Sequence, residues 1–346
     1  MIYFNSDYLE GAHPSIMVKM AETNMVQTVG YGEDEYCEAA REKIKTACQA
    51  PEADVHFLVG GTQTNTTVIA AILRPWQGVI SAVSGHINCH EAGAIESTGH
   101  KVITLPTGNG KITAQQVADY VEWHKNDEST EHIVQPGMVY ISHPTEAGTL
   151  YTKAELAELY DTCRRYGLPL YIDGARLGYG LAAEESDMTL PEFARLCDVF
   201  YIGGTKVGAL FGEAVVIINE SIKKDFRFIM KQRGGRLAKG RLLGIQFDAL
   251  FTDDLYFKIS RHAIEMAHQI RDIFVSAGYP LLFDSPTNQQ YPIMPDTELA
   301  EIGKSFGYEY WERVDETHSG VRFCASWATT QENVDALREA VNALKK

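Results

Sequence analysis

The sequence predicts an α/β protein with a mostly parallel sheet in a large domain and a small α+β domain at the C-terminal end. Through the first part of the chain, short and continuously apolar runs alternate with helical segments. Strands that are apolar at every position are typical of a parallel sheet covered by helices on both faces. After a long helical stretch, the pattern changes to short strands and helices, which indicates a second, smaller unit.

The apolar runs predict seven strands, at 55–59, 79–83, 101–105, 138–142, 169–172, 199–202 and 214–218, the last of which could run antiparallel. Helical patterns predict helices at 14–22, 34–48, 62–73, 90–97, 114–124, 154–165 and 190–196, and a long helical stretch at 242–278. The C-terminal part predicts strands near 280–283, 290–293, 308–311 and 320–325, with helices at 297–306 and 330–344.

These elements divide the chain into three parts. We expect an irregular N-terminal arm at 1–35, a large domain at 36–250 and a small C-terminal domain at 251–346. A chain of 346 residues is longer than one typical domain, which favours two units and leaves room for a large core.

The composition narrows the functional classes. The net charge of −15 argues against nucleic acid or an anionic membrane as partner. No apolar run reaches about 18 residues, so we expect no transmembrane helix, and the first residues lack the features of a signal peptide. The six cysteines are scattered without a CxxC pair, which favours reduced thiols in a cytoplasm.

Lys206 is the residue around which the chain is organised. It follows the apolar run Val199–Ile202 and the glycines Gly203 and Gly204. A half-buried amine at this place would have a lowered pKa, the state in which a lysine attacks a carbonyl to form a Schiff base. The alternative on this stretch alone is a lysine that reaches solvent at the end of a strand.

Two turns after earlier strands carry further candidates. Gly60, Gly61, Thr62 and Gln63 precede a helix, whose N-terminus favours an anion such as phosphate. The alternative is an ordinary capped turn, and no Walker or GxGxxG motif is present.

After the next strand, His86 is followed by Cys89, His90 and Glu91. A metal site is one interpretation of this group, but no second ligand cluster has the spacing of a zinc site, so we predict none. A structural histidine or an aromatic platform for a flat ligand is the preferred interpretation.

Asp173 ends the strand at 169–172 and is followed by Gly174, Ala175 and Arg176. A carboxylate at a strand end could pair with a pyridine nitrogen and keep it protonated. The alternative is a helix cap with Arg176 as its ion-pair partner. Because ligands bind beyond the carboxyl ends of parallel strands, we expect the anion site, the platform, Asp173 and Lys206 to share one crevice.

In this order, the motifs resemble fold-type I pyridoxal-phosphate enzymes and, more narrowly, the low-specificity threonine aldolase family of the β-eliminating lyase group. The similarity covers nearly the whole chain. The matching stretches are Asn5–Asp7, Tyr31–Asp34, Gly61–Asn65, His86 with Glu91–Gly93, Arg74–Trp76, Pro144–Thr149, Asp173–Arg176, Thr205–Lys206, and Val321–Arg322 before Ser326–Trp327.

The resemblance implies a role for each matched residue. Lys206 would hold pyridoxal 5′-phosphate, Asp173 would pair with its ring nitrogen, and His86 would stack on the ring. The phosphate would be bound by Gly61, Thr62 and Gln63. The substrate carboxylate would be held by Ser6, Arg176 and Arg322. Tyr31 and Arg233 would approach the site of a neighbouring subunit, because the site in this family lies at a dimer interface, often within a tetramer.

The implied reaction is the cleavage of L-threonine, L-allo-threonine or related β-hydroxy-α-amino acids to glycine and an aldehyde, through an external aldimine, with His86 or a water it holds as the base. Rival interpretations are another fold-type I reaction, such as β-elimination or transamination, and a non-catalytic scaffold. Two positions depart from the family: Tyr171 replaces a histidine, and at His143-Pro144 a second histidine is either displaced by one position or absent. These departures leave the base and the substrate preference open.

Overall fold

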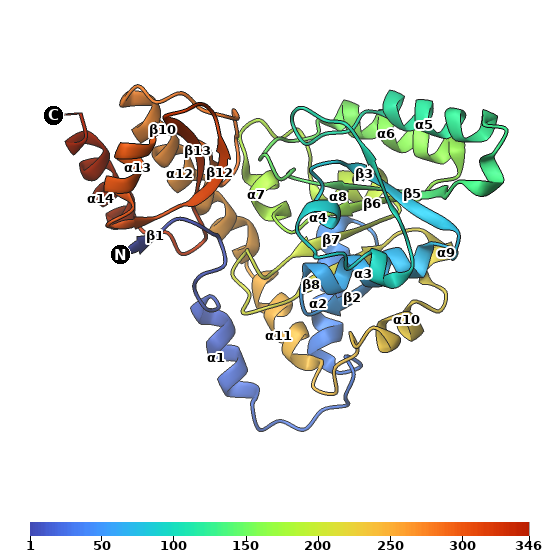
Figure 1. Cartoon of the computed structure of the whole chain (residues 1–346). Helices are drawn as coiled ribbons and strands as arrows, with labels where there is room; N and C mark the ends of the chain where they lie inside the picture. Colours follow the sequence, from blue (N-terminus) through green and yellow to red (C-terminus); the bar gives the residue numbers. More distant parts are fainter. Residues whose placement is uncertain (346) are drawn as a thin grey trace.

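The computed structural model describes residues 1–345, and its centre is a seven-stranded sheet with the order β2-β8-β7-β6-β5-β3-β4 (Figure 1). Only β8 runs antiparallel to its neighbours β2 and β7, while the other pairs are parallel. The prediction of a mostly parallel sheet is therefore confirmed. The strands are β2 Asp54–Leu58, β3 Gln77–Ala82, β4 Val102–Leu105, β5 Gln135–Ser142, β6 Leu170–Asp173, β7 Val199–Gly203 and β8 Glu213–Ile217.

Both faces of this sheet are buried, which explains why its strands are apolar at every position. Successive strand residues point to opposite faces. Val139 and Ile141 of β5 lie in one hydrophobic core, whereas Met138 and Tyr140 lie in the other. Helices cover each face, so neither core is open to water.

The helices on the first face include α2 Glu35–Cys48, α5 Ala114–Asn126, α6 Lys153–Tyr166, α8 Leu190–Arg195 and α11 Arg241–Leu250. The second face is covered by α3 Gly61–Ile72 and α10 Phe226–Gln232. The sequence explains where two of these helices begin, because α5 and α6 start with capping boxes at Thr113 and Thr152. The remaining helices are α1 Pro14–Thr23, α4 His86–Cys89, α7 Leu177–Ala182, α9 Glu220–Lys223, α12 Leu255–Ser276, α13 Asp296–Ile302 and α14 Gln331–Ala343.

The C-terminal part has its own sheet and core. Strands β10 Ile293–Pro295, β13 His318–Cys324 and β12 Glu309–Arg313 form an antiparallel sheet, with β9 Gln289–Gln290 beside β13. Helices α12 and α14 pack in its core, which also takes in Phe4 from the start of the chain. Helix α12 contributes to this core and to the core of the large sheet. The division of the chain near residue 250 stays a prediction.

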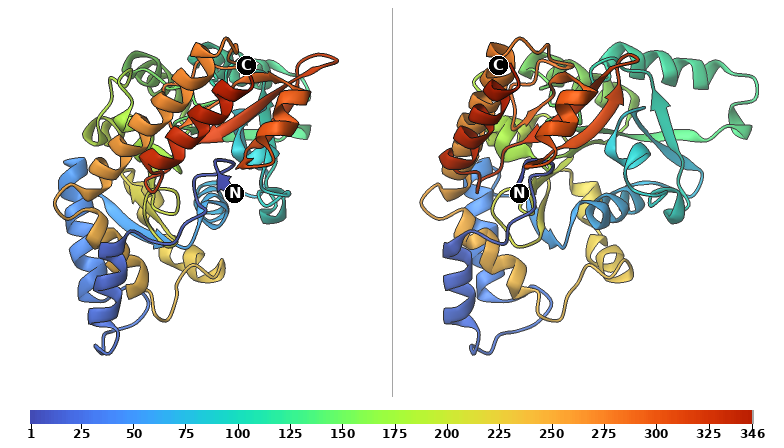
Figure 2. Two further views of the ribbon diagram at one scale, coloured as in Figure 1. Left: turned by 90° about the vertical axis from the view of Figure 1, so that its left-hand side faces the viewer. Right: turned by 60° about the vertical axis from the view of Figure 1, so that its left-hand side comes forward.

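The N-terminal segment connects distant parts of the molecule. Strand β1 Ile2–Tyr3 pairs in parallel with β11 Phe306–Gly307, so the chain begins in the C-terminal part. It then runs to α1, which lies along α11 at the far end of the large sheet, as both views of Figure 2 show. The segment between these two ends passes beside the carboxyl ends of the strands, where Asp7 becomes fully buried.

Three predicted elements are wrong in detail. The helix expected at 90–97 is absent, because Ala92 and Gly93 have positive φ angles of 49° and 73° that a helix cannot contain. A short helix, α4, stands before it instead. The long helical stretch breaks between α11 and α12, where Asp253 and Asp254 also have positive φ. The strand expected at 280–283 is reduced to a single bridge between Leu281 and Pro292.

The sheet places the expected site residues at one edge. Asp173 is the last residue of β6, and Lys206 follows the end of β7. These two strand ends approach very closely: a Cβ on Gly174 would lie 1.9 Å from the Tyr201 carbonyl oxygen, so only glycine fits there. None of the helices in residues 1–345 combines the length and the apolar character needed to cross a bilayer.

Candidate active site

Two adjoining cavities meet at Lys206. The inner one, of about 310 Å³, is lined by Gly60 and Gly61 of the turn before α3 together with Asp173. The outer one, of about 420 Å³, opens toward the C-terminal part. Tyr8, His86 and Lys206 line both cavities. The expected crevice therefore exists, and each compartment has a volume in the range of small-molecule sites.

The carboxylate of Asp173 is buried and accepts four hydrogen bonds. Its donors are the Tyr201 hydroxyl, the Tyr140 hydroxyl at 2.7 Å, the Asn65 amide at 3.1 Å and the Ala175 backbone N–H at 3.0 Å. Burial alone would raise the pKa of this carboxyl, but a charge on His86 and the tyrosine hydrogen bonds hold the pKa below its usual range. Asp173 thus carries a fixed negative charge that faces the inner cavity.

Asn65 connects Asp173 to His86. Its amide nitrogen donates to Glu91 at 2.7 Å as well as to Asp173, and its carbonyl oxygen accepts from the Tyr171 hydroxyl at 2.7 Å. Glu91 in turn lies 2.8 Å from Nδ1 of His86. Tyr171, one of the departures noted in the sequence, therefore orients this network, and the His86 ring is held at the point where the two cavities meet.

Lys206 is surrounded by charged groups. Burial and the charge of Arg176 lower the pKa of the Lys206 amine below its usual range, while Asp7, Asp173 and Glu213 oppose this shift. Glu213 is itself buried and accepts hydrogen bonds from the Thr205 hydroxyl at 2.8 Å and from the Gly204 N–H at 3.0 Å. Burial raises the pKa of Glu213 to about 8, although these hydrogen bonds oppose the rise. The lowered pKa is the state expected of a lysine that attacks a carbonyl.

The start of α3 has free backbone donors. The first hydrogen bond of this helix joins the Thr64 N–H to the Gly60 carbonyl oxygen at 3.0 Å. The N–H groups of Gly61, Thr62 and Gln63 come before it and so have no acceptor within the helix. Gly60, the N-cap residue, has no side chain to cap them. The Gln63 side chain is engaged elsewhere, by the Val59 N–H and the Arg233 carbonyl oxygen. These three amides can bind a phosphate in the inner cavity.

Arg176 forms a bidentate ion pair with Asp7. Its Nε and Nη2 donate to the two carboxylate oxygens at 2.6 and 3.0 Å. Burial would raise the pKa of Asp7, but the charges of Arg176 and Lys206 lower it to about 2. Sequence reasoning expected Arg176 to bind a substrate carboxylate. The structure gives two of its nitrogens, Nε and Nη2, to Asp7, while Arg176 also lines the outer cavity.

Ser6 and Arg322 carry polar atoms without partners. Within the described residues, the Ser6 hydroxyl and Nε of Arg322 are buried and accept or donate no hydrogen bond. Other nitrogens of Arg322 bind the Gln289 side chain and the Asn5 carbonyl oxygen, both at 3.1 Å, which fixes the guanidinium at the wall of the outer cavity. Unpartnered buried donors are costly unless a ligand satisfies them, and a carboxylate would do so.

His143 does not face the site. It is buried against Phe193, with ring centroids 4.8 Å apart, and neither ring nitrogen has a partner among residues 1–345. Burial lowers the pKa of His143 to about 3, so the ring is neutral. His143 is therefore a core residue and does not supply the family's histidine to the site. Glu146, three residues later, lines the outer cavity instead. Sequence reasoning missed Glu146 as a site residue, although its place just after β5 was a signal that could have found it.

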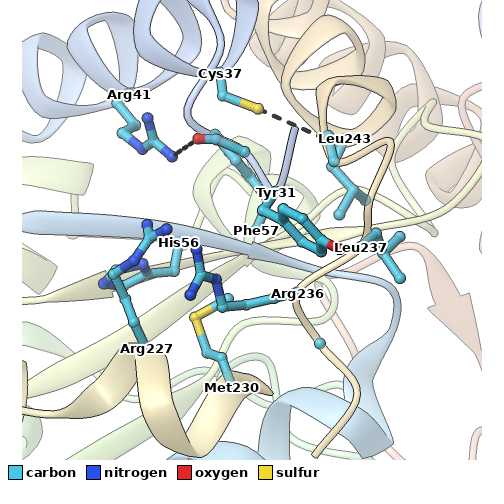
Figure 3. A pocket seen from close by; sticks show the side chains of 13 residues that line it. Tyr31, Cys37, Arg41, His56, Phe57, Arg227, Met230, Arg236, Leu237 and Leu243 are labelled. Carbon is cyan, nitrogen blue, oxygen red and sulfur yellow. Dashed lines mark hydrogen bonds between the residues drawn. The ribbon is translucent and has the colours of Figure 1, made fainter. Parts of the chain in front are cut away.

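Tyr31 and Arg233 lie apart from Lys206 within one chain. Figure 3 shows Tyr31 in a separate pocket with Arg227 and Arg236. The Lys231 amine lies 4.7 Å from the centroid of the Tyr31 ring, and the Arg236 guanidinium lies 5.8 Å from it. Neither Tyr31 nor Arg233 lines the two cavities at Lys206.

Most of the other groups expected in the crevice come together, but Ser6 and Gln63 line neither cavity. Lys206, Asp173, His86, Gly61 and Thr62 line the inner cavity, and Arg176 and Arg322 line the outer one. Among the described residues, no three His, Cys, Asp or Glu side chains are grouped as a metal site would require.

Comparisons with known proteins agree with this geometry. The β-eliminating lyase family matches residues 4–339. A threonine aldolase structure from Leishmania major is 42% identical, covers 100% of both chains and has a TM-score of 0.97. The low specificity L-threonine aldolase of Pseudomonas aeruginosa is 28% identical over 337 residues, 96% of this chain and 95% of that protein.

A more distant likeness concerns the fold alone. An aspartate aminotransferase variant from Thermus thermophilus is 14% identical, with a TM-score of 0.72 over 99% of this chain and 91% of that chain. The expectation of a fold-type I architecture is thereby confirmed. With the family match over nearly the whole length and a full-length relative at 42% identity, the chain belongs to the threonine aldolases of the β-eliminating lyase family.

Proposed function

We propose that this protein is a pyridoxal-phosphate-dependent aldolase that cleaves L-threonine, L-allo-threonine or related β-hydroxy-α-amino acids to glycine and an aldehyde. The observation that carries the proposal is the meeting of three groups at one sheet edge. A lysine with a lowered pKa, a charged and buried aspartate, and a helix start with free amides line one cavity, in a chain 42% identical to a threonine aldolase.

The residues of the inner cavity fit pyridoxal 5′-phosphate. The free amides of Gly61, Thr62 and Gln63 would hold its phosphate, and Lys206 would attach its aldehyde. Asp173, kept ionised by its hydrogen-bond donors, would hold the ring nitrogen in its protonated form. When bound, the cofactor supplies an electron sink for the bond that breaks at Cα.

The residues of the outer cavity would bind and orient the substrate. We propose that Ser6, Arg176 and Arg322 hold the α-carboxylate, since both arginines line the outer cavity and the Ser6 hydroxyl and Nε of Arg322 are buried without a partner among residues 1–345. Fixing the carboxylate sets which bond at Cα stands perpendicular to the ring, which is a positioning effect. His86, where the two cavities meet, would cover one ring face near the substrate hydroxyl.

We propose further that the enzyme is a homo-oligomer, a dimer or tetramer, whose sites are shared between subunits. Tyr31 lines a separate pocket, and neither Tyr31 nor Arg233 lines the cavities at Lys206 of its own chain, which is the placement expected if they serve a neighbour's site. The arm also exposes apolar side chains that a partner would cover: Met17, Val18, Met25, Val26 and Val29. A cytoplasmic location is part of the proposal, supported by six free thiols in the described chain.

Product analysis tests the reaction. The purified protein, supplied with pyridoxal 5′-phosphate, is incubated with L-threonine and L-allo-threonine, and glycine, acetaldehyde, ammonia and 2-oxo acids are measured. Glycine and acetaldehyde in equal amounts support the aldolase. Ammonia with a 2-oxo acid, or amino-group transfer to an added 2-oxo acid, would replace it with β-elimination or transamination. A Lys206→Ala variant is the control for cleavage that does not involve the site.

A further inference from the structure

Glu146 is a carboxyl group in the outer cavity that the proposed function has not used. It lies four residues after Ser142, the last residue of β5. One of its oxygens, Oε1, accepts from the Ser142 hydroxyl at 2.6 Å and from the His86 backbone N–H at 2.9 Å. Both hydrogen bonds that this carboxyl accepts from residues 1–345 go to this oxygen. The other oxygen, Oε2, is therefore the one that a ligand in the cavity can reach.

The position of Glu146 places it on the substrate side. Glu146 lines the outer cavity with Lys206, Arg176 and Arg322 but does not line the inner cavity, whereas His86 lines both. No basic side chain in residues 1–345 forms an ion pair with Glu146. A carboxylate held by two donors and free at its other oxygen is suited to accept a proton from a ligand.

Burial makes this carboxyl a better base than an exposed glutamate. Burial raises the pKa of Glu146 above its usual range, and the nearby charge of Asp173 acts in the same direction. The hydrogen bond from Ser142 and a charge on His86 oppose the rise. The remaining titratable and charged groups that surround Glu146 or line the outer cavity with it are Tyr8, His90, Tyr140, Tyr151, Arg176, Lys206, Tyr291, Glu309, Tyr310 and Arg322.

We propose that Glu146 binds the β-hydroxyl of the substrate and takes its proton as the Cα–Cβ bond breaks. This inference rests on the proposed aldolase function. The oxygen–hydrogen electron pair becomes the second bond of the aldehyde carbonyl, and the electron pair of the Cα–Cβ bond stays on Cα. A proton then adds to Cα to give glycine, and Glu146 releases the proton it accepted. The net change is the transfer of one proton from the hydroxyl to Cα, with no oxidant or reductant.

If Glu146 takes this proton, its loss should impair the reaction of substrates that carry a β-hydroxyl and should leave the binding of glycine, which has none, unchanged. The test compares Glu146→Gln, which keeps the size of the side chain, with the wild-type holoenzyme. We expect kcat/KM for cleavage of L-allo-threonine to fall by about 100-fold or more. The Kd of glycine, measured by calorimetry, and the exchange of its α-protons into D₂O should stay within about threefold of wild type. Glu309→Gln, at an exposed position on the rim of the same cavity, is the matched control for the loss of one negative charge.

A second variant tests the pKa of the group. Ser142→Ala removes a hydrogen bond that lowers the pKa of Glu146, so the acid limb of the pH profile of kcat/KM should move to higher pH. A residue that only supports the structure would not shift this limb.

Three results would overturn the proposal. In the first, Glu146→Gln cleaves within about threefold of wild type. In the second, glycine binding and exchange fall as far as cleavage does. In the third, the wild-type protein binds glycine but cleaves no hydroxy amino acid, which would remove the aldolase function and this role together.

Discussion

Arg176 and Asp7 form a buried ion pair that joins the N-terminal arm to the end of strand β6, across 169 residues of sequence. Both guanidinium–carboxylate contacts are short, and Asn288 donates a third hydrogen bond to Asp7 at 2.8 Å. The arm is therefore part of the active-site wall. The pair also holds Arg176 at the wall of the outer cavity.

Breaking this pair should destabilise the protein. Asp7→Asn leaves Arg176 buried without a countercharge, and a loss of about 3–5 kcal/mol in the free energy of unfolding is expected for a buried pair that loses one partner. Urea denaturation at neutral pH measures the loss. The exposed pair Lys304–Glu301 provides the control, because Glu301→Gln should have no measurable effect. An Asp7→Asn protein as stable as wild type would contradict the role of the pair.

The Asp7 carboxyl also predicts a pH dependence. Its pKa is about 2 in the folded chain and near 3.9 in an unfolded one, so the folded state binds fewer protons between these values. The stabilisation is therefore present above about pH 4 and is lost as the pH falls toward 2. Wild type should lose stability in this range more steeply than Asp7→Asn. Parallel curves for the two proteins would rule this contribution out.

Asp173→Asn should keep the fold but lose turnover. The substitution removes the charge that would hold the ring nitrogen protonated. It also replaces one acceptor oxygen by an amide N–H₂, which cannot accept the hydrogen bonds that the Tyr140 and Tyr201 hydroxyls donate in the wild type. We expect kcat for cleavage to fall by about 100-fold or more, while circular dichroism stays unchanged. Turnover near the wild-type value would refute the pairing of Asp173 with the cofactor.

His143 should influence stability at low pH and not the reaction. Its pKa is about 3 in the folded chain and near 6.5 unfolded, so the unfolded state binds more protons between these values. The native protein therefore loses stability as the pH falls from about 6.5 toward 3. His143→Gln should lose less stability over this range than wild type, measured by urea denaturation. A large change in kcat/KM at neutral pH would show instead that His143 takes part in the chemistry.

Glu213 should lower the stability of the protein at high pH, the opposite of the effect of His143. Its pKa is about 8 in the folded chain and near 4.3 unfolded, so the folded state binds more protons in this interval and loses stability as the pH rises through it. Glu213→Gln keeps the shape of the side chain and removes this loss. The variant should therefore gain stability relative to wild type between about pH 5 and 8. Equal pH dependences for the two proteins would show that Glu213 is ionised throughout.

If each active site is built from two subunits, two inactive variants should restore activity when they form a hybrid oligomer. Lys206→Ala and Arg233→Ala proteins should each be inactive when alone, because each lacks one half of every site. If the halves come from different subunits, hybrids formed by unfolding and refolding the two together contain some complete sites and regain cleavage. A mixture that stays inactive, although light scattering shows hybrid oligomers, would contradict the sharing of sites.

The sequence predicted the parts of the site that follow strands. Lys206, Asp173 and the Gly60–Gly61 turn are near strand ends, and parallel strands bring their carboxyl ends to one edge whatever the details of packing. The residues it missed act through tertiary contacts. Asn65 reaches Asp173 across 108 residues, and nothing local to Asn65 indicates that contact.

Three buried tyrosines that the sequence analysis missed could have been found from the strand pattern. Tyr140 and Tyr171 are directly paired in adjacent strands, and Tyr201 lies two residues beyond the partner of Tyr171, so all three point to the same sheet face. Buried tyrosines repeated on one face call for an acceptor, and two of them donate to Asp173. Glu146 follows the end of β5, which was a positional signal, but the raised pKa values of Glu146 and Glu213 depend on burial that only the folded chain shows.

The central claim is that Lys206 binds pyridoxal 5′-phosphate covalently. The most direct measurement is the visible absorbance of the wild-type protein and of Lys206→Ala after incubation with the cofactor and gel filtration. The wild-type protein should keep a yellow absorbance band that shifts on addition of glycine, and Lys206→Ala should lose that band. A Lys206→Ala protein with the same band, or a wild-type protein that stays colourless, would contradict the account.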